Sequence, residues 1–359
     1  MERCAAMILA AAGEERMRSS RPKPVHLLCG RPMVQYVIDA LSDVDVDRVV
    51  IVVGEGAEQV TKKLSESAAD PRLVFAEQRS QRGSAETALV GLEVFADDFG
   101  DDDLIVLSGN TPLLSPGLIR ALLDHHRDVG AAATVLGVPA DPHSGLGRLV
   151  PAKADDCVDR VASPTDFFDL DWLADGGVYC FRRAMLAPAI RRLQPDPQTG
   201  AYLLADVVEV LTEAGHRVAM HVVADAVDVQ PVDDRVQLAA AEGVIRERTN
   251  RAWMRRGVTM VDPAQTYVDT TVELAVDVTL FPGTMLQGAT VIGAGAEVGP
   301  DTRLVDCAVG HHARVEKTMS RDAEIGEYAH VGPFAVLEPG AQVPAGAVTG
   351  PFYHATQHE

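Results

Sequence analysis

The sequence predicts an α/β domain with a mostly parallel sheet and helices on both faces, followed by a short parallel β-helix of hexapeptide repeats. Between about residues 5 and 235, short apolar runs alternate with longer amphipathic stretches, which is typical of parallel strands joined by helices. From residue 268 onward an aliphatic residue recurs at every sixth position, as in the coils of a β-helix. We expect a first domain at 1–235, a connecting helix at 236–257, a β-helix at 258–350 and a tail at 351–359.

Size and composition allow two hydrophobic cores and exclude several classes of protein. The chain has 359 residues, of which 47% are hydrophobic and 23% charged, which excludes disordered and fibrous proteins. A formal net charge of −20 argues against a nucleic-acid partner, because phosphate backbones are bound by clustered Lys and Arg. Five cysteines without C-x-x-C spacing indicate neither a disulfide framework nor a zinc site. We therefore expect a cytoplasmic protein with no membrane partner, since the apolar start at 5–12 is too short for a signal or a span.

Elements of the first domain follow from apolar periodicity. Amphipathic stretches predict helices at 32–41, 84–95 and 117–126. Ligands of such sheets bind where strands end at their carboxyl side, so the segments after the strands are candidates for function. The expected strands are rich in β-branched and aliphatic residues and lie at 6–11, 48–53, 72–76, 103–108 and 132–138.

The second domain is predicted from aliphatic residues that share one six-residue step, with a break after residue 304. A triangular coil of three hexapeptides would point each of them inward, whereas ordinary antiparallel strands would not hold the spacing so strictly. We expect His311 and His312 at a polar corner, and His354 and His358 exposed in a frayed tail. Glycine and aspartate residues suited to corners lie between the aliphatic positions, at Gly283, Gly288, Gly293, Gly295, Gly299 and Asp301. The aliphatic residues are Val268, Leu274, Leu280, Leu286, Ile292, Val298, Leu304, Ile325, Val331, Leu337 and Val343.

The predicted connecting helix has an apolar side and a cationic side. Leu238, Ala241, Ile245 and Trp253 fall roughly on one side. Its arginines are interpreted as a solvated face, with a functional basic patch as the alternative. They are Arg246, Arg248, Arg251, Arg255 and Arg256.

A loop with two cations follows the first strand. Residues 9–26 read LAAAGEERMRSSRPKPVH, in which a turn of small residues is followed by Arg16 and Lys23. Such a turn exposes backbone amides, and together with two cations it suits a polyphosphate.

These motifs resemble those of the bacterial bifunctional N-acetylglucosamine-1-phosphate uridyltransferase/glucosamine-1-phosphate acetyltransferase family. That family carries L-A-A-G-x-G-T-R-M-x-S-x-x-P-K here, which Arg16, Met17, Ser19, Pro22 and Lys23 match. The resemblance implies a Rossmann-like nucleotidyltransferase domain and a left-handed β-helix. It also implies that Arg16 steadies the leaving pyrophosphate and that Lys23 holds phosphate oxygens in the transition state. The turn that would contact the nucleotide comprises Leu9, Ala10, Ala11, Ala12 and Gly13.

The middle of this loop departs from the family pattern. Without a gap, Ala12, Glu14 and Glu15 stand where the family has Gly, Gly and Thr, and with a one-residue deletion Gly13 recovers the first glycine alone. Two carboxylates beside a triphosphate would repel it unless they point outward or meet a metal ion. Altered or lost catalysis is therefore one hypothesis.

Two further segments resemble the family's base-reading and metal-binding motifs. Gln78, Gly83 and Ser84 match a Q-x-x-x-x-G-T motif that reads uracil, and a plain strand-to-helix turn is the alternative. Ser108 and Gly109 match an L-x-S-G-D-x-P-L-L motif. The metal-binding aspartate of this motif is Asn110 here, and its partner asparagine in G-V-N-N-R-x-Q-L is Asp233. We infer that Asn110 and Asp233 hold Mg²⁺ with the charge moved across the site, whereas the alternative is a coincidence in a decaying site.

The residues expected on the sugar side match less well. Gly147 keeps its place in a G-Y-G-R motif and would approach the sugar by its backbone. Ser163 replaces the glutamate of V-E-x-x-D, and Asp175 replaces the asparagine of N-[AT]-G. A later E-Y-Y-L-T-D motif keeps Tyr202, Leu204 and Asp206. Such changes should alter which sugar or cyclitol phosphate binds, unless they are drift in a tolerant pocket.

We therefore expect a Mg²⁺-dependent sugar-1-phosphate nucleotidyltransferase that favours UTP and forms a UDP-sugar such as UDP-N-acetylglucosamine. The resemblance gives way after 332–340, before the family's acetyl-transfer residues, so we expect no acetyltransferase activity. It implies a homo-oligomer such as a trimer. The alternatives are a catalytically impaired paralogue that acts as a nucleotide-sugar-binding scaffold or regulator, and an enzyme for a different nucleotide or cyclitol phosphate.

Overall fold

The computed structural model describes residues 3–11, 16–67, 70–95, 102–139, 146–152, 156–162, 172–197 and 199–356. The chain divides into two compact units, Met1–His26 with Pro32–Leu238 and Leu27–Arg31 with Ala239–Glu359. The boundary near residue 238 falls inside helix α7 (Arg235–Arg255), which occupies most of the connecting helix expected at 236–257. No helix in the described part of the chain is long and apolar enough to cross a membrane.

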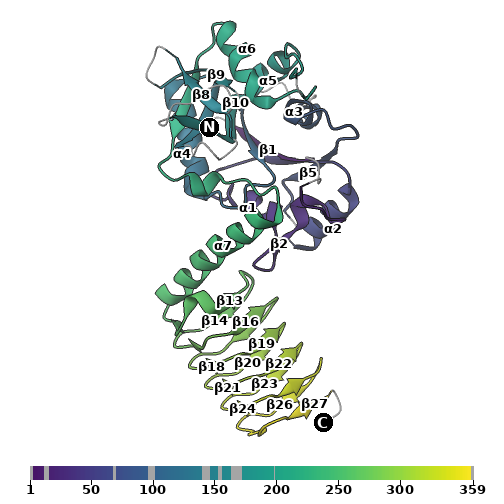
Figure 1. The fold of residues 1–359 in the computed structure, drawn as a ribbon, viewed down its shortest axis with the longest axis vertical. Helices are drawn as coiled ribbons and strands as arrows, with labels where there is room; N and C mark the ends of the chain where they lie inside the picture. Colours follow the sequence, from purple (N-terminus) through teal and green to yellow (C-terminus); the bar gives the residue numbers. More distant parts are fainter. Residues whose placement is uncertain are drawn as a thin grey trace. The chain divides into compact units, whose positions relative to one another are not determined.

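The first unit is built on a nine-stranded, mostly parallel sheet with the main order β11-β7-β10-β6-β1-β4-β5 (Figure 1). Strand β10 runs antiparallel to β6 and β7, and β8 pairs with β10 and β9. The five strands expected from the sequence are β1, β4, β5, β6 and β7, each with bounds shifted by at most two residues. The strands are β1 (Cys4–Ala10), β4 (Arg48–Val53), β5 (Leu73–Glu77), β6 (Asp103–Ser108), β7 (Ala133–Pro139), β8 (Arg148–Pro151), β9 (Val158–Ala162), β10 (Leu173–Arg182) and β11 (Val218–Val222).

Alternation along β1 explains why helices cover both faces of this sheet. Ala6 and Ile8 belong to one buried cluster, whereas Ala5 and Met7 belong to another, because successive strand side chains point to opposite faces. Helices α1, α2 and α4 contribute to the first cluster, and α3, α5 and α6 contribute to the second. The helices are α1 (Met33–Asp39), α2 (Ala57–Ser67), α3 (Ser84–Glu93), α4 (Pro116–Val129), α5 (Arg183–Ile190) and α6 (Val207–Glu213), with short 3₁₀ turns η1 (Lys23–Val25), η2 (Leu204–Asp206) and η3 (Ala226–Val229).

The second unit contains three stacks of short parallel strands, which form a parallel β-helix (Figure 1). Each aliphatic residue of the six-residue pattern is at most 8% exposed, so the predicted inward direction is confirmed. The first stack is β12 (Thr259–Met260), β15 (Thr279–Leu280), β18 (Glu297–Val298), β21 (Arg314–Val315) and β24 (His330–Val331). The second is β13 (Thr266–Val268), β16 (Thr284–Gln287), β19 (Arg303–Val305), β22 (Met319–Arg321), β25 (Val336–Leu337) and β27 (His354–Ala355). The third is β14 (Glu273–Leu274), β17 (Val291–Ile292), β20 (Ala308–Val309), β23 (Glu324–Ile325) and β26 (Gln342–Val343).

The break in the six-residue pattern is a run of shorter corners, and the coil itself continues through it. Val309, Val315 and Ser320 occupy the inward positions between Leu304 and Ile325, and Ser320 lies beside Leu304 in the strand register. The buried Ser320 hydroxyl accepts a hydrogen bond from the Cys307 thiol, Sγ to Oγ 3.3 Å. A polar residue therefore stands in an aliphatic position because it has a partner inside the coil.

The C-terminal residues correct one expectation. His354 lies on β27, which pairs in parallel with β25, and its Nε2 is 3.3 Å from Glu338 Oε1. A frayed tail is therefore wrong for residues 351–356, although the His354 side chain is exposed as expected. His358 lies outside the described residues.

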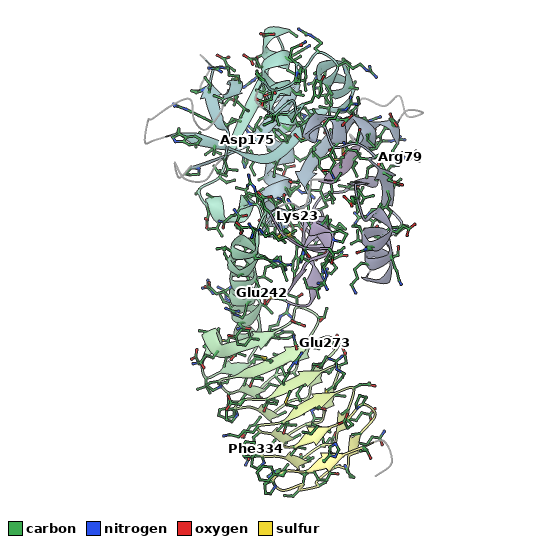
Figure 2. The ribbon with its side chains drawn as sticks, turned by 45° about the vertical axis from the view of Figure 1, so that its right-hand side comes forward. Lys23, Arg79, Asp175, Glu242, Glu273 and Phe334 are labelled. Atoms are coloured by element: carbon green, nitrogen blue, oxygen red, sulfur yellow. The ribbon has the colours of Figure 1, made fainter. Side chains whose placement is uncertain are left out.

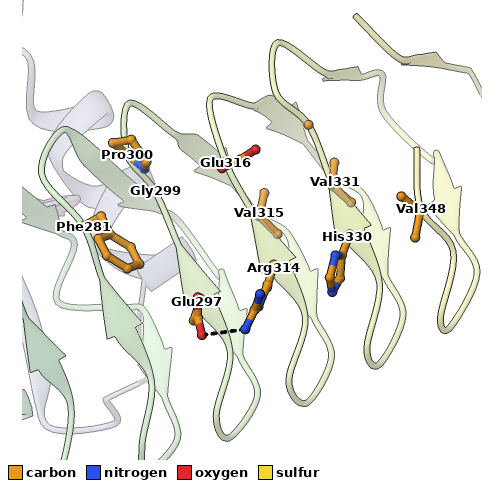
Figure 3. Close-up of a pocket in the computed structure, with 11 residues that line it drawn as sticks. Phe281, Glu297, Gly299, Pro300, Arg314, Val315, Glu316, His330, Val331 and Val348 are labelled. Carbon is orange, nitrogen blue, oxygen red and sulfur yellow. Dashed lines mark hydrogen bonds and ion pairs between the residues drawn. The ribbon is translucent and has the colours of Figure 1, made fainter. Parts of the chain in front are cut away.

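Corners and outer faces of the β-helix carry the remaining polar residues. His312 has a left-handed φ of 56° at the expected corner, and its ring stacks on Tyr328. The outer face of the first stack has a hollow of about 420 Å³ in which Arg314 pairs with Glu297 at 3.3 Å, with His330 as the next outward residue (Figure 3). Arg246 of α7 lies over the Tyr267 ring, Arg256 lies over the Trp253 ring, and Arg251 pairs with Glu247 at 2.5 Å.

Candidate active site

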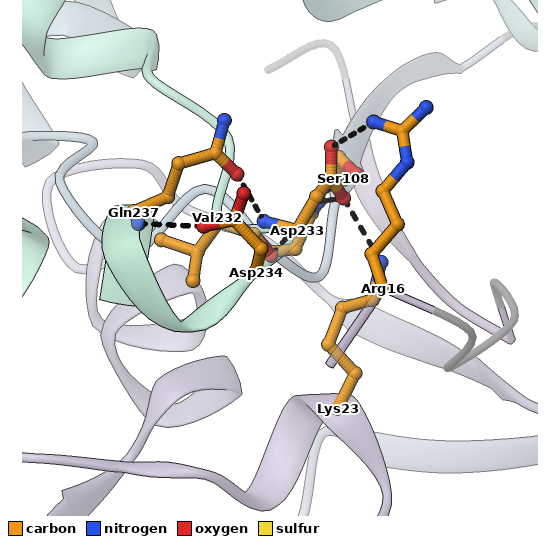
Figure 4. A network of polar contacts seen from close by, with 8 residues as sticks. Arg16, Lys23, Ser108, Val232, Asp233, Asp234 and Gln237 are labelled. Carbon is orange, nitrogen blue, oxygen red and sulfur yellow. Dashed lines mark hydrogen bonds and ion pairs between the residues drawn. The ribbon is translucent and has the colours of Figure 1, made fainter. Parts of the chain in front are cut away.

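Asp233 collects three polar side chains from distant segments of the first unit. Lys23 on η1 donates to Asp233 Oδ1 at 2.9 Å, and Asn110 Nδ2 donates to the same oxygen at 2.8 Å. Arg16 lies 3.9 Å from the other carboxylate oxygen. Figure 4 shows the Lys23 and Arg16 side chains directed toward the Asp233 carboxylate. The structure thus brings together Arg16, Lys23, Asn110 and Asp233, the four residues that the sequence singles out for phosphate and metal binding.

Backbone contacts explain why Asn110 and Asp233 meet. Asn110 follows the carboxyl end of β6, and its carbonyl oxygen accepts from Val232 N at 2.8 Å. Gln237 Oε1 accepts from Asp233 N at 2.7 Å, while Asp234 Oδ1 accepts from Gln237 N at 2.8 Å (Figure 4). The first turn of α7 therefore fixes the Asp233 backbone, as side-chain capping of helix amides commonly does.

Arg235 ties the cation-bearing loop to the same helix. Its Nε donates to the Met17 carbonyl at 3.3 Å, and its NH1 lies 3.3 Å from His26 Nδ1. The pKa of His26 is lowered by burial and by the Arg235 charge, which favours the neutral ring. Arg235 therefore contacts the loop that carries Lys23 on both sides of this lysine, at Met17 and at His26. Its position in the QPVDDRVQL segment, next to the proposed metal ligand, could have suggested such a role.

The two cations differ in how much they can move. The Lys23 side chain is 9% exposed, whereas the Arg16 side chain is 79% exposed. A buried ammonium requires a counter-charge, and Asp233 supplies it. Lys23 is thus a fixed charge, and Arg16 a cation able to reach outward.

The donor set at Asp233 fits a divalent cation. Mg²⁺ takes oxygen ligands, commonly one or two carboxylates together with substrate phosphates. Asp233 provides a carboxylate. The side-chain amide oxygen of Asn110, Oδ1, accepts a hydrogen bond from Ser108 Oγ at 2.5 Å. A turn of the Asn110 amide would direct its oxygen toward Asp233, and Ser108 could then accept from the amide nitrogen, because a hydroxyl both donates and accepts. The residues at this position could therefore hold Mg²⁺ between them.

The remaining residues of the first turn line the site to different degrees. Ala10 and Ala11 are buried at the end of β1, and the adjoining Leu9 lines a cavity on the sheet. A Cβ on Gly109 would lie 3.0 Å from the Ala10 Cβ, so the two strand ends pack closely. Ala12 and Gly13, with Glu14 and Glu15, lie outside the described residues.

Gln78 and Gly83 lie in the turn after β5. Contacts with neighbouring residues explain why a glutamine and a glycine stand at these two positions. Gln78 is 4% exposed and accepts from Thr87 Oγ1 at 2.7 Å, while its Nε2 donates to Glu86 at 3.3 Å. Gly83 has φ 111°, and a Cβ there would lie 2.3 Å from the Tyr202 carbonyl oxygen. The glycine is thus required by backbone packing, a reason the sequence did not provide.

A cavity of about 450 Å³ opens beside these residues, at the carboxyl ends of β1 and β6. Of the residues that the sequence singles out, Leu9, Ser84, Ser108, Gly147 and Asp175 line it. Ser163 lies outside the described residues. Leu204 and Asp206 of the sequence segment AYLLAD also line the cavity, whereas the lining residues Tyr179, Asp196 and Leu203 were not singled out by the sequence analysis.

Asp175 is the most buried carboxyl of this cavity. It is 8% exposed on β10, where Oδ1 accepts from Gly177 N at 2.9 Å and Oδ2 accepts from the Tyr179 hydroxyl. Burial raises the pKa of the Asp175 carboxyl, and the two hydrogen bonds oppose that rise. Figure 2 shows Asp175 and Lys23 in the same α/β unit.

Comparisons with known proteins agree with this fold. Residues 6–210 match the family model of the MobA-like NTP transferase domain, which defines a nucleotidyltransferase. A solved structure of CMP:2-keto-3-deoxy-manno-octonic acid synthetase complexed with CTP shares the fold, with a TM-score of 0.54 at 20% identity over 68% of this chain and 99% of that one.

Curated relatives are closer in sequence. The chain is 39% identical over 354 residues to the bifunctional protein GlmU of Streptomyces avermitilis, covering 98% of this chain and 73% of that protein. It is 38% identical to the protein of the same name from Streptomyces coelicolor, again over 98% of this chain and 73% of the relative. The chain therefore belongs to the GlmU family.

Proposed function

We propose that this protein is a Mg²⁺-dependent uridyltransferase that joins UTP to a sugar 1-phosphate and releases pyrophosphate. The observation that carries the proposal is the convergence of Lys23, Arg16 and Asn110 on Asp233, with Lys23 Nζ 2.9 Å from the carboxylate. Ser108 donates to Asn110 and also lines the neighbouring cavity, so a phosphate held by Lys23 would have room for its sugar beside it.

In the proposed reaction an oxygen of the sugar phosphate attacks the α-phosphorus of UTP. The new oxygen–phosphorus bond forms as the bond from the α-phosphorus to the bridging oxygen breaks, and pyrophosphate leaves with the bonding pair. Positioning and charge stabilisation supply the catalysis, without a covalent protein intermediate. Bound Mg²⁺, held by Asn110 and Asp233, would offset negative charge on the phosphates.

The two cations have separate tasks in this scheme. Lys23 has three N–H donors, and the bond to Asp233 uses one of them. Among the described residues the other two have no hydrogen-bond partner in the protein, and they would hold oxygens of the α-phosphate as charge develops there. Exposed Arg16 would follow the departing pyrophosphate.

The choice of uracil is supported by the Gln78 amide. Its oxygen and its nitrogen each make one hydrogen bond within the protein and each keep capacity for a second. The adjoining hollow of about 660 Å³ at the ends of β4 and β5 is lined by Gln78 and by residues 54–59. An amide that still donates and accepts matches the edge of uracil.

Pyrophosphate release over a panel of nucleoside triphosphates and sugar 1-phosphates, with and without Mg²⁺, tests the proposal. We expect release with UTP and Mg²⁺ and a marked drop with CTP, ATP or GTP. Nucleotide binding without release from any pair would contradict the enzyme and favour the scaffold hypothesis. The homo-oligomer expected from the sequence stays a prediction, which light scattering of the purified chain would check.

A further inference from the structure

We propose that Glu86 fixes the direction of the Gln78 side-chain amide and thereby makes the nucleotide site select uracil over cytosine. The inference rests on the proposed nucleotidyl transfer, because it explains how that reaction would choose its base. The Q-x-x-x-x-G-T motif ends at Ser84, so the role of Glu86 is argued from the contacts of this chain alone.

Three donors of the turn before α3 converge on the Glu86 carboxylate. Gln78 Nε2 donates to Glu86 Oε2 at 3.3 Å, and the Arg82 backbone N–H donates to the same oxygen at 3.0 Å. The Ser80 hydroxyl donates to the other oxygen, Oε1, at 3.3 Å. These contacts hold a carboxylate against one end of the Gln78 amide.

Thr87 contacts the other end of the amide, but its hydroxyl does not fix the direction. Thr87 Oγ1 lies 2.7 Å from Gln78 Oε1 and 3.1 Å from the Gly83 carbonyl oxygen, and it has one proton for the two. If that proton went to Gly83, the hydroxyl could accept from Gln78 Nε2 with the amide turned over, because a hydroxyl both donates and accepts. The Thr87 hydroxyl is therefore compatible with both directions of the amide.

Glu86 removes this freedom because a carboxylate only accepts. In the reversed amide, Gln78 Oε1 would face the Glu86 carboxylate, and two acceptors would oppose each other. Gln78 is 4% exposed, and an unmatched polar contact is costly where water has little access. The oxygen and nitrogen of an amide are nearly the same in shape, so partners of this kind decide its direction. Nε2 therefore faces Glu86, and Oε1 faces Thr87.

The direction of this amide decides which pyrimidine matches it. Uracil presents an N3–H donor beside a carbonyl acceptor, whereas cytosine presents an unprotonated N3 acceptor beside an amino donor. Gln78 lines the hollow of about 660 Å³ proposed for the base. In the observed direction, Oε1 can accept from the uracil N3–H and Nε2 can donate to the carbonyl. The reversed amide would match cytosine instead.

A purely structural role is the competing interpretation of Glu86. Its contacts with Ser80 and Arg82 order the turn, and a disordered turn would weaken the binding of every base. Such a role affects UTP and CTP alike. The ratio of kcat/KM for the two nucleotides therefore separates base selection from ordering of the turn.

The test is Glu86→Gln, assayed by pyrophosphate release with UTP and with CTP at fixed sugar 1-phosphate and Mg²⁺. The glutamine keeps the size and one acceptor of the side chain but adds an N–H donor, so that Gln78 can take both directions. We expect wild type to favour UTP by about tenfold or more in kcat/KM, the effect of one mismatched polar pair. The variant should lower this ratio at least about fivefold and raise kcat/KM for CTP, whereas kcat at saturating UTP should stay within about twofold. An unchanged ratio, or an equal loss for both nucleotides, would overturn the inference.

Two further variants locate the effect. Glu93→Gln removes one charge from an exposed position of the same helix and should leave the ratio unchanged. Thr87→Val removes the hydroxyl but keeps the carboxylate, so it should weaken kcat/KM for UTP and CTP without lowering their ratio. A fall in the ratio as large as that of Glu86→Gln, in either of these variants, contradicts the assignment to Glu86.

Failure of the proposed function has a different signature. If wild type releases pyrophosphate with UTP and CTP alike, nucleotidyl transfer stands and the inference about Glu86 is overturned. If no triphosphate releases pyrophosphate, the transfer proposal fails, and calorimetric binding of UTP and CTP to wild type and Glu86→Gln decides about the amide. A preference for UTP that the variant loses would still support the inference. The same preference in both proteins, no preference in wild type, or no binding would overturn it.

Discussion

The two units of the chain differ in how far apart in sequence their cooperating residues lie. In the β-helix, polar partners sit one coil apart, as in Arg314 with Glu297, which are 17 residues apart, and His354 with Glu338, 16 residues apart. In the α/β unit, Lys23 and Asp233 are 210 residues apart. A substitution in a coil can therefore be compensated by residues of the adjacent coil. A substitution in the site must be compensated by a residue that is distant in the sequence.

Asn110 and Asp233, which are 123 residues apart in the sequence, illustrate such a compensation. Relative to the family motifs, the amide and the carboxylate have changed places, yet they meet at 2.8 Å. The total of one carboxylate and one amide is unchanged. The carboxylate now lies beside Lys23, so the proposed metal binding and the counter-charge for a buried lysine would depend on the same group.

Removal of the buried cation should produce the largest effect. We expect Lys23→Met to lower kcat/KM for UTP by about 10²–10³-fold, because a preorganised charge at the transferring phosphoryl group is lost. Steady-state pyrophosphate release measures it. Lys62→Met, an exposed lysine of the same unit, serves as the control and should keep wild-type activity. Equal activity of the two variants would show that Lys23 is merely structural.

Truncation inside the coil should act on stability and spare activity. We expect Leu304→Ala to lower the free energy of unfolding by about 2–5 kcal/mol, because a fully buried side chain leaves a cavity. Ser320→Ala, at the neighbouring inward position, should cost less than about 1.5 kcal/mol, the usual contribution of one hydrogen bond. Urea unfolding of both variants gives the comparison. Similar losses would mean that the break in the pattern is as tightly packed as the regular coils.

The amide and carboxylate exchange can be reversed experimentally. Asp233→Asn should reduce Mg²⁺-dependent turnover about 10–100-fold, because the carboxylate ligand and the partner of Lys23 are both lost. The double variant Asn110→Asp with Asp233→Asn restores one carboxylate and should recover most of that loss. A Mg²⁺ titration of the three proteins decides the matter, since full turnover in Asp233→Asn alone is incompatible with the exchange.

Backbone packing at the turn after β5 gives the smallest of these effects. We expect Gly83→Ala to destabilise the protein by about 1–3 kcal/mol, because its φ of 111° is unfavourable with a Cβ and that atom would lie 2.3 Å from the Tyr202 carbonyl. Gly117→Ala provides the matched control, since a Cβ there meets nothing within 4 Å. Thermal unfolding should show opposite signs for the two variants, and a shared sign would remove the packing argument.

Much of the fold could be predicted because its signals are local. The cores of β1, β4, β5, β6 and β7 are continuous apolar runs, and every aliphatic residue of the six-residue step points inward. Strands β8, β9, β10 and β11 of this sheet escaped prediction, and apolar runs alone do not reveal that β10 pairs antiparallel with β6 and β7. The continuation of the coil through Ser320 escaped it because a buried serine breaks the aliphatic pattern.

The sequence by itself determined the two kinds of architecture, because periodicity is a local property of the chain. It also singled out Arg16, Lys23, Asn110 and Asp233 together, through the spacing of the motifs in which they lie. Tertiary structure alone decided that Asp233 is the carboxylate that Lys23 meets, and that Gly83 is required by Tyr202. It also placed Asp196 and Asp206 around one cavity with Asp175. The physical reason is that burial and electrostatic partners depend on segments brought together by folding, which no local pattern encodes.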